Sequence, residues 1–122
     1  MKSSSIKLML NGELPYKDFK LIISKEMGEY LSGGKERGKS RPVYLDEDVD
    51  LFIGERDLKA LCEAFLNGFL DESEINYTAD AILLSNRVTF ESESVSDRIG
   101  FLTDPEINGS LSKENIEKLM QP

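Results

Sequence analysis

Histidine and tryptophan are absent from this chain of 122 residues, and cysteine occurs only once. Histidine is the side chain on which most general acid–base catalysis and most zinc sites depend. A single cysteine excludes an intramolecular disulfide and fits a reducing compartment. The composition therefore favours a binding protein over an enzyme, and we expect no catalytic residue, no metal ligand and no cofactor.

Long apolar runs are missing as well. The apolar stretch closest to the N-terminus, residues 6–10, is short and contains Lys7. A secretory signal needs a longer apolar region, and a membrane-spanning helix needs about 20 apolar residues. We therefore expect a cytoplasmic protein that makes no membrane contact.

Charge is distributed unevenly along the chain, whose formal net charge is −8. Residues 1–42 carry nine Lys and Arg against five Asp and Glu, whereas residues 43–122 carry six against eighteen. Such an acidic surface repels nucleic acid, attracts basic proteins and speeds their association. We predict a protein partner with a basic surface and no nucleic acid. Acidity that only supports solubility is the alternative interpretation.

The carboxylates predicted to contact this partner come from one acidic run and from two helices. The run covers residues 46–50, where four of five side chains are acidic. The exposed helix faces around residues 63 and 93 supply the others. The predicted contact residues are Asp46, Glu47, Asp48, Asp50, Glu63 and Glu93.

Apolar residues recur at spacings of three and four in five segments, which is the pattern of amphipathic helices. Typical helix boundaries surround them, such as Asp71 and Glu74, which have the spacing of a capping box. The segments are residues 16–32, 58–69, 71–84, 92–102 and 112–120. We predict a single, mainly α-helical domain over residues 1–122, an irregular bundle of about five helices. At most a small strand element is expected, within residues 5–10 or 43–53, and residues 88–90 are interpreted as a short apolar connection.

Two segments lack any such pattern. Residues 1–5 are expected to fray. Residues 33–41 contain no apolar side chain, three glycines and four basic residues. A segment of this composition buries nothing, so we predict a mobile basic loop.

Cys62 lies in the apolar stripe of its predicted helix, between Leu61 and Phe65. A reactive thiolate needs an electropositive pocket, whereas the neighbour here is Glu63. We therefore predict a buried, unreactive thiol.

Residues 104–115 resemble a calcium-binding EF-hand loop, with Asp104, Asn108 and Gly109 at the expected positions. The bidentate glutamate that closes such a loop is replaced by Asn115. Helix caps and a turn explain the same residues, with Ser112 as the cap of the last helix. A degenerate calcium-binding module therefore remains one alternative function.

The chain from about Asp57 to Met120 resembles small acidic immunity proteins of bacterial toxin systems. The resemblance covers about half of the chain and rests on three motifs, residues 58–68, 76–81 and 104–109. It implies a compact bacterial antitoxin that binds a basic toxin domain, and it transfers no functional residue by position. A helical adaptor that joins larger assemblies is the other alternative, and the sequence leaves the oligomeric state open.

Overall fold

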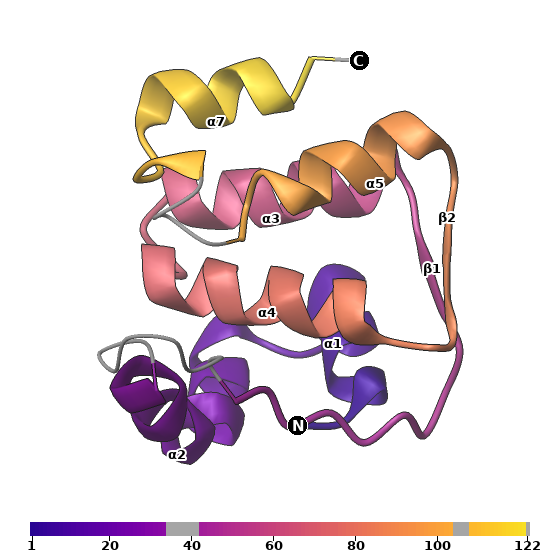
Figure 1. Cartoon of the computed structure of the whole chain (residues 1–122), viewed down its shortest axis with the longest axis vertical. Helices are drawn as coiled ribbons and strands as arrows, with labels where there is room; N and C mark the ends of the chain where they lie inside the picture. Colours follow the sequence, from indigo (N-terminus) through magenta and orange to yellow (C-terminus); the bar gives the residue numbers. More distant parts are fainter. Residues whose placement is uncertain (34–41, 104–107, 122) are drawn as a thin grey trace.

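The computed structural model describes residues 1–33, 42–103 and 108–121 (Figure 1). Within these ranges the protein is mainly helical, as predicted, and a pair of short strands completes it. The helices are α1 (Ser3–Leu10), α2 (Tyr16–Gly33), α3 (Glu55–Leu66), α4 (Glu72–Leu84), α5 (Glu93–Gly100) and α7 (Lys113–Leu119). The strands are β1 (Leu51–Ile53) and β2 (Val88–Phe90).

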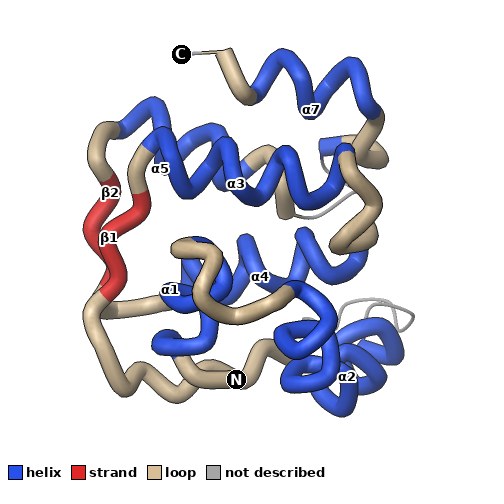
Figure 2. The backbone as a smooth tube through the Cα atoms, turned by 180° about the vertical axis from the view of Figure 1, so that it is seen from behind, coloured by secondary structure: helices blue, strands red, loops and turns tan. Residues whose placement is uncertain are grey.

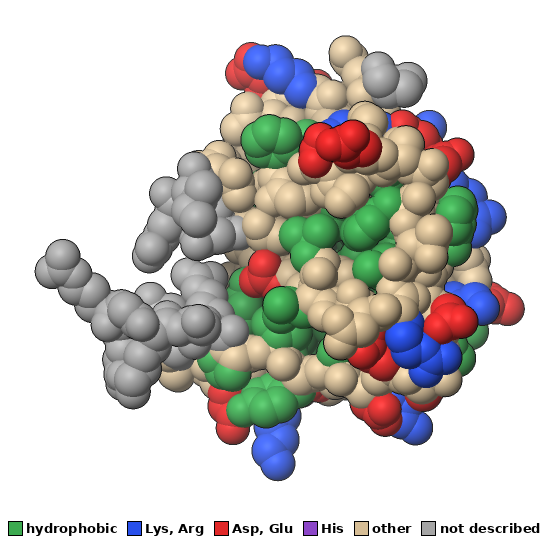
Figure 3. Space-filling view, turned by 45° about the vertical axis from the view of Figure 1, so that its right-hand side comes forward, with side chains coloured by type: hydrophobic (Ala, Val, Ile, Leu, Met, Phe, Trp, Pro, Cys, Tyr) green, Lys and Arg blue, Asp and Glu red, His purple; other side chains and the backbone are tan. Residues whose placement is uncertain are grey.

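Helix α4 lies at the centre of the arrangement. It packs against α2 on one side and against α3 and α5 on the other, while α7 covers α3 (Figures 1 and 2). The two strands run along one side of the molecule. Charged side chains are spread over the surface, and hydrophobic ones are visible between them (Figure 3). No helix in the described ranges is long and apolar enough to cross a membrane.

The predicted capping box fixes the start of α4. The Asp71 carboxylate accepts a hydrogen bond from the Glu74 backbone at 2.8 Å, and the Glu74 carboxylate accepts one from the Asp71 backbone at 2.8 Å. Further along α4, the buried Asn76 amide donates to the backbone carbonyls of Leu102 and Thr103 at 2.7 and 3.0 Å. The helix is therefore tied to the chain that follows α5.

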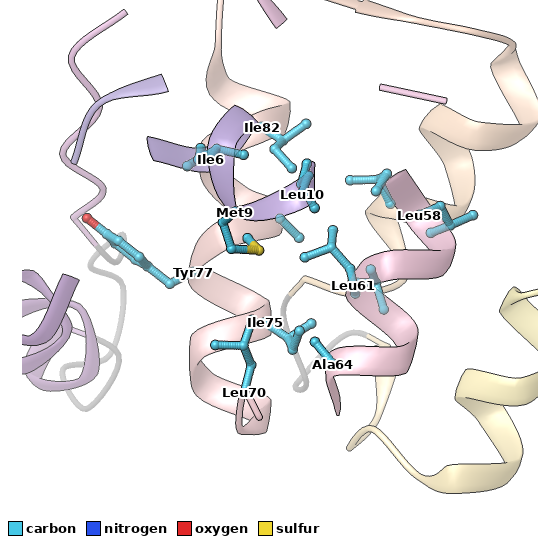
Figure 4. Close-up of a cluster of buried hydrophobic side chains, with 14 of the residues drawn as sticks. Ile6, Met9, Leu10, Leu58, Leu61, Ala64, Leu70, Ile75, Tyr77 and Ile82 are labelled. Atoms are coloured by element: carbon cyan, nitrogen blue, oxygen red, sulfur yellow. The ribbon is translucent and has the colours of Figure 1, made fainter. Parts of the chain in front are cut away.

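The core is built where α1, α3 and α4 meet. Ile6 and Met9 of α1 point toward Leu61 of α3 and Ile82 of α4, and all four side chains are at most 1% exposed (Figure 4). Each buried aliphatic side chain of this size contributes about 1.5–3 kcal/mol relative to an exposed one. One cluster of buried residues extends from α1 to α7.

The prediction that residues 1–5 fray is wrong. Ser3 begins α1 and is fully buried. Its backbone donates to the Asp46 carbonyl at 2.9 Å, and the Asp46 backbone donates to the Met1 carbonyl at 2.8 Å. The Met1 amino group also bonds Glu26 of α2 at 2.7 Å. These partners are distant in sequence, so no local pattern announces them. The predicted loop 33–41 lies outside the described residues, except for Gly33 at the end of α2.

Strand β1 confirms the predicted strand element within residues 43–53. It pairs in parallel with β2, with Leu51 opposite Val88 and Ile53 opposite Phe90. Helices α3 and α4 form the connection between the two strands. The expectation of an unpaired connection at residues 88–90 is therefore wrong, because three residues are too few to show an alternating pattern.

Cys62 is fully buried on α3, as predicted, and burial raises the pKa of its thiol from 9.0 to about 11. Such a rise leaves about 100-fold less thiolate at a given pH than an unperturbed thiol has. We expect Ellman's reagent to label the native protein at least about 100-fold more slowly than the protein in urea. Equal rates in the two states would show that Cys62 is accessible.

Candidate protein-interaction site

The predicted acidic run, residues 46–50, is bound to other parts of the chain. Asp48 accepts hydrogen bonds from the Ser3 hydroxyl at 3.0 Å, the Ser4 backbone at 2.9 Å and the Ser4 hydroxyl at 2.5 Å. Lys2, at the N-cap position of α1, provides no side-chain cap. Asp48 therefore caps α1 from a distant part of the sequence. The bonds from Ser4 and Ser3 lower the pKa of Asp48 from 3.8 to about 2.

Glu47 and Asp50 are engaged in the same way by the turn that follows α4. The Glu47 carboxylate accepts hydrogen bonds from the Ser85 hydroxyl and from the backbones of Asn86 and Arg87, the last two at 2.8 and 3.2 Å. The bond from Ser85 is the main cause of a lowered pKa of Glu47. Asp50 accepts a hydrogen bond from Arg87 Nε at 2.6 Å.

The other predicted contact residues lie apart from one another. Asp46 is exposed, and its carboxylate accepts no hydrogen bond from the described residues. Glu63 is exposed in the last turns of α3, with Lys59 Nζ 4.0 Å away. Glu93 is exposed in the first turn of α5, next to β2. Their role in partner binding stays a prediction, as does that of Glu47, Asp48 and Asp50.

A different surface emerges where β1 and β2 face solvent. Side chains alternate between the two faces of a strand, so Leu51 and Ile53 enter the core while Phe52 points outward. The Phe52 side chain is 62% exposed. We call this surface the outer strand face, and it consists of Asp50, Phe52, Gly54, Arg87, Thr89 and Glu91.

Gly54 leaves room for Phe52 and Glu91 to approach the backbone of the outer strand face. A Cβ atom at this position would lie 3.1 Å from Glu91 Oε2 and 3.4 Å from Phe52 Cε1. The backbone at Gly54 is extended, with φ of −115°, so space rather than conformation requires the glycine. Glu91 Oε2 also accepts a hydrogen bond from the Glu55 backbone at 2.8 Å, which holds the carboxylate at the start of α3. An aromatic ring and a carboxylate thus converge above Gly54.

The surroundings of this contact are strongly acidic. Residues 46–57 and 85–97 together carry nine carboxylates and two arginines. One of the arginines, Arg87, is already paired with Asp50. Acidic side chains, interrupted by basic ones, are visible on the side of the molecule where the strands lie (Figure 3). The field at the outer strand face therefore favours a positively charged ligand.

A groove of about 800 Å³ runs beside the outer strand face. One wall combines residues 50–57 with Thr89 and Glu91 of the outer strand face, and the other is formed by Lys7, Leu10 and Asn11 at the end of α1. Arg56 Nη2 donates to Asn11 Oδ1 at 3.1 Å and so joins the two walls.

These groups are suited to binding cations rather than to bond chemistry. A protonated amine or guanidinium is attracted by the face of an aromatic ring and by carboxylates beside it. In the described ranges, no group of three or more Cys, Asp and Glu side chains is placed to hold a metal ion. The first four residues of the calcium-like loop, 104–107, lie outside these ranges. Ser112 caps α7 as predicted, since its hydroxyl accepts a hydrogen bond from the Asn115 backbone at 3.1 Å.

Comparison of the chain with protein-family models, curated proteins and solved structures finds no match. The resemblance to immunity proteins therefore stays a prediction. Sequence reasoning also missed Phe52, Gly54 and Glu91. Residues 51–53 are all apolar, so the sequence carries no local signal that Phe52 faces solvent while Leu51 and Ile53 are buried.

Replacement of Asp48 by Ala is expected to lower the free energy of unfolding at neutral pH, because the Ser4 backbone and hydroxyl lose their acceptor. The pKa of Asp48 is lower in the folded protein, at about 2, than its ordinary value of 3.8. Its stabilising effect is therefore complete above about pH 4 and is lost as the pH falls toward about 2. Urea denaturation at several pH values should show that the difference in free energy of unfolding between the native chain and Asp48→Ala becomes smaller as the pH falls across this range.

Asp46→Ala is the matched control, because this neighbouring carboxylate is exposed and makes no such bonds. It should leave the urea midpoint almost unchanged. An equal loss of stability in both variants would contradict the capping role of Asp48.

Proposed function

We propose that this chain is a non-catalytic binding protein that recognises a basic protein through the outer strand face. The observation that carries the proposal is the meeting of the Phe52 ring and the Glu91 carboxylate above Gly54. A ring that is 62% exposed, on a molecule with a buried core, is available to a partner. The acidic charge around it selects the kind of partner.

The energetics of interfaces support this assignment. A few residues carry most of the binding energy of an interface, and aromatic side chains surrounded by other contacts are prominent among them. A partner arginine stacked on Phe52 would gain a cation–π contact of about 0.5–2 kcal/mol. Glu91 would then accept its hydrogen bonds from a position already fixed by the Glu55 backbone. The carboxylate loses little conformational freedom on binding, because it is held before the partner arrives.

Neutralisation of a basic toxin domain is the specific form of this function that the immunity-protein resemblance implies. An acidic surface that speeds capture suits such a role, because an immunity protein has to bind before the toxin acts. In this form the protein would be a bacterial, cytoplasmic antitoxin. The product of an adjacent toxin-like gene is the first partner to test.

A helical adaptor is a second candidate, favoured by the exposed apolar residues of α2. Leu21 is 72% exposed there, and Leu31 is 42% exposed. Together with Met27 they line a groove of about 620 Å³ between α2 and the start of α4. Size-exclusion chromatography over a range of protein concentrations tests this alternative, since an apolar surface of this kind promotes self-association.

Phe52→Ala and Glu91→Gln are expected to weaken binding of a basic partner about tenfold or more each, which corresponds to about 1.4 kcal/mol. Phe52→Ala removes the ring, whereas Glu91→Gln removes the charge and keeps an oxygen for the Glu55 backbone. Proteins retained by the immobilised chain at low salt would be identified by mass spectrometry and purified. Surface plasmon resonance would then give their rate constants.

Leu21→Ala is the control, because it shortens an equally exposed apolar side chain on a different surface. It should leave binding unchanged. The association rate of the native chain should fall as added salt shortens the Debye length from about 30 to about 8 Å. If the association rate is independent of salt and both Phe52→Ala and Glu91→Gln bind as well as the native chain, the outer strand face is not the binding surface.

A further inference from the structure

The free edge of β1 offers backbone hydrogen-bonding groups beside the outer strand face. Leu51 donates to the Arg87 carbonyl at 3.0 Å, and the Ile53 carbonyl accepts from the Glu91 backbone at 2.9 Å. In a parallel ladder only every second residue of a strand bonds a given neighbour. The N–H and C=O of Phe52 therefore point away from β2. No hydrogen bond joins them to another described residue.

The groove at this edge leaves space for another chain. The wall on the side of the strands contains eight consecutive residues, 50–57, which include all of β1, together with Thr89 and Glu91. The opposite wall brings Leu10, which is 8% exposed, to the edge of the hydrophobic core. An open strand edge beside such a groove is the arrangement used when an extended peptide adds to a sheet.

We propose that the basic partner docks as an extended segment that adds a third strand to the free edge of β1. The segment would exchange backbone hydrogen bonds with Phe52. This inference rests on the proposed function and specifies the form in which the partner is recognised.

The chemistry of the two faces defines the sequence of that segment. Side chains of an added strand alternate between the outer face and the interior. Those on the outer face lie beside Phe52, Asp50 and Glu91, which select basic residues. Those on the other face enter the groove toward Leu10, which selects apolar residues. The recognised segment therefore alternates basic and apolar side chains.

Amide hydrogen exchange measured by NMR tests this docking mode directly. The probe is a synthetic peptide of about ten residues, the length of a long strand, that alternates arginine and valine. In the free protein we expect the Phe52 amide to exchange much faster than those of Leu51 and Ile53, which are bonded to β2. With saturating peptide, exchange at Phe52 should slow about tenfold or more, whereas the two neighbours should change little.

A pair of substitutions at one position separates backbone from side-chain effects. Phe52→Pro removes the N–H that points to the partner, and proline is tolerated at strand edges where that group is not bonded. Phe52→Leu keeps the N–H and an apolar side chain. We expect the proline variant to bind the peptide about tenfold more weakly than the leucine variant. If circular dichroism shows that the proline variant is unfolded, the exchange experiment on the native chain decides alone.

Two results would overturn strand addition. In the first, the peptide shifts the resonances of the Phe52 ring and the Glu91 carboxylate while the Phe52 amide continues to exchange fast. Docking would then use side chains alone, and the proposed function would stand. In the second, folded basic proteins bind in a way that depends on Phe52 and Glu91, but the peptide does not bind at about 1 mM. Failure of the proposed function would give a different result. Binding of basic proteins would then be unaffected by substitution of Phe52 or Glu91 and by salt.

Discussion

Burial of α4 is the constraint on which the rest of the structure depends. Most of its side chains are buried, including polar ones, so their polar groups need hydrogen-bond partners within the protein. The fully buried Tyr77 donates from its hydroxyl to Glu26 of α2 at 2.5 Å and accepts from the Tyr44 backbone at 3.1 Å. Burial is the main reason that the pKa of Tyr77 is raised above its ordinary value. Tyr30 of α2 donates to Asp80 of α4 at 2.5 Å. The central helix thus fixes the positions of α2 and of the chain that leads to β1.

This arrangement explains why most carboxylates of the acidic run, residues 46–50, already accept hydrogen bonds from other parts of the chain. The chain over residues 42–50 contains no helix or strand and forms one isolated backbone bridge, so its position depends on contacts with other elements. Asp48 binds the first turn of α1, and Glu47 binds the turn after α4. The acidic run of the sequence, residues 46–50, therefore joins α1 to the turn after α4. Further negative charge lies beside the strands, where Glu91 and Glu93 follow β2 and are exposed.

The outer strand face depends on distant segments that meet in register. Parallel pairing places Glu91 beside Gly54, and the absence of a side chain there lets its carboxylate reach the start of α3. Arg98, 9% exposed, holds Glu55 and donates to the Leu119 carbonyl at 2.9 Å, so α7 also supports this corner. These contacts hold Glu91 and Glu55 in place, which would reduce the entropy cost of the proposed binding.

The sequence by itself determined the elements whose signals are local. Apolar spacing and caps located the five predicted helices, since helical hydrogen bonds and caps join residues only three or four positions apart. The predicted caps Asp71 and Ser112 accept the expected backbone bond, and Ser92 caps α5 in the same way. Only the tertiary structure decided that residues 1–5 are ordered and that β1 pairs with β2. It also decided that the backbone N–H and C=O of Phe52 lie at the free edge of β1. Each of these depends on contacts between residues 25 or more positions apart, and no periodicity encodes such contacts.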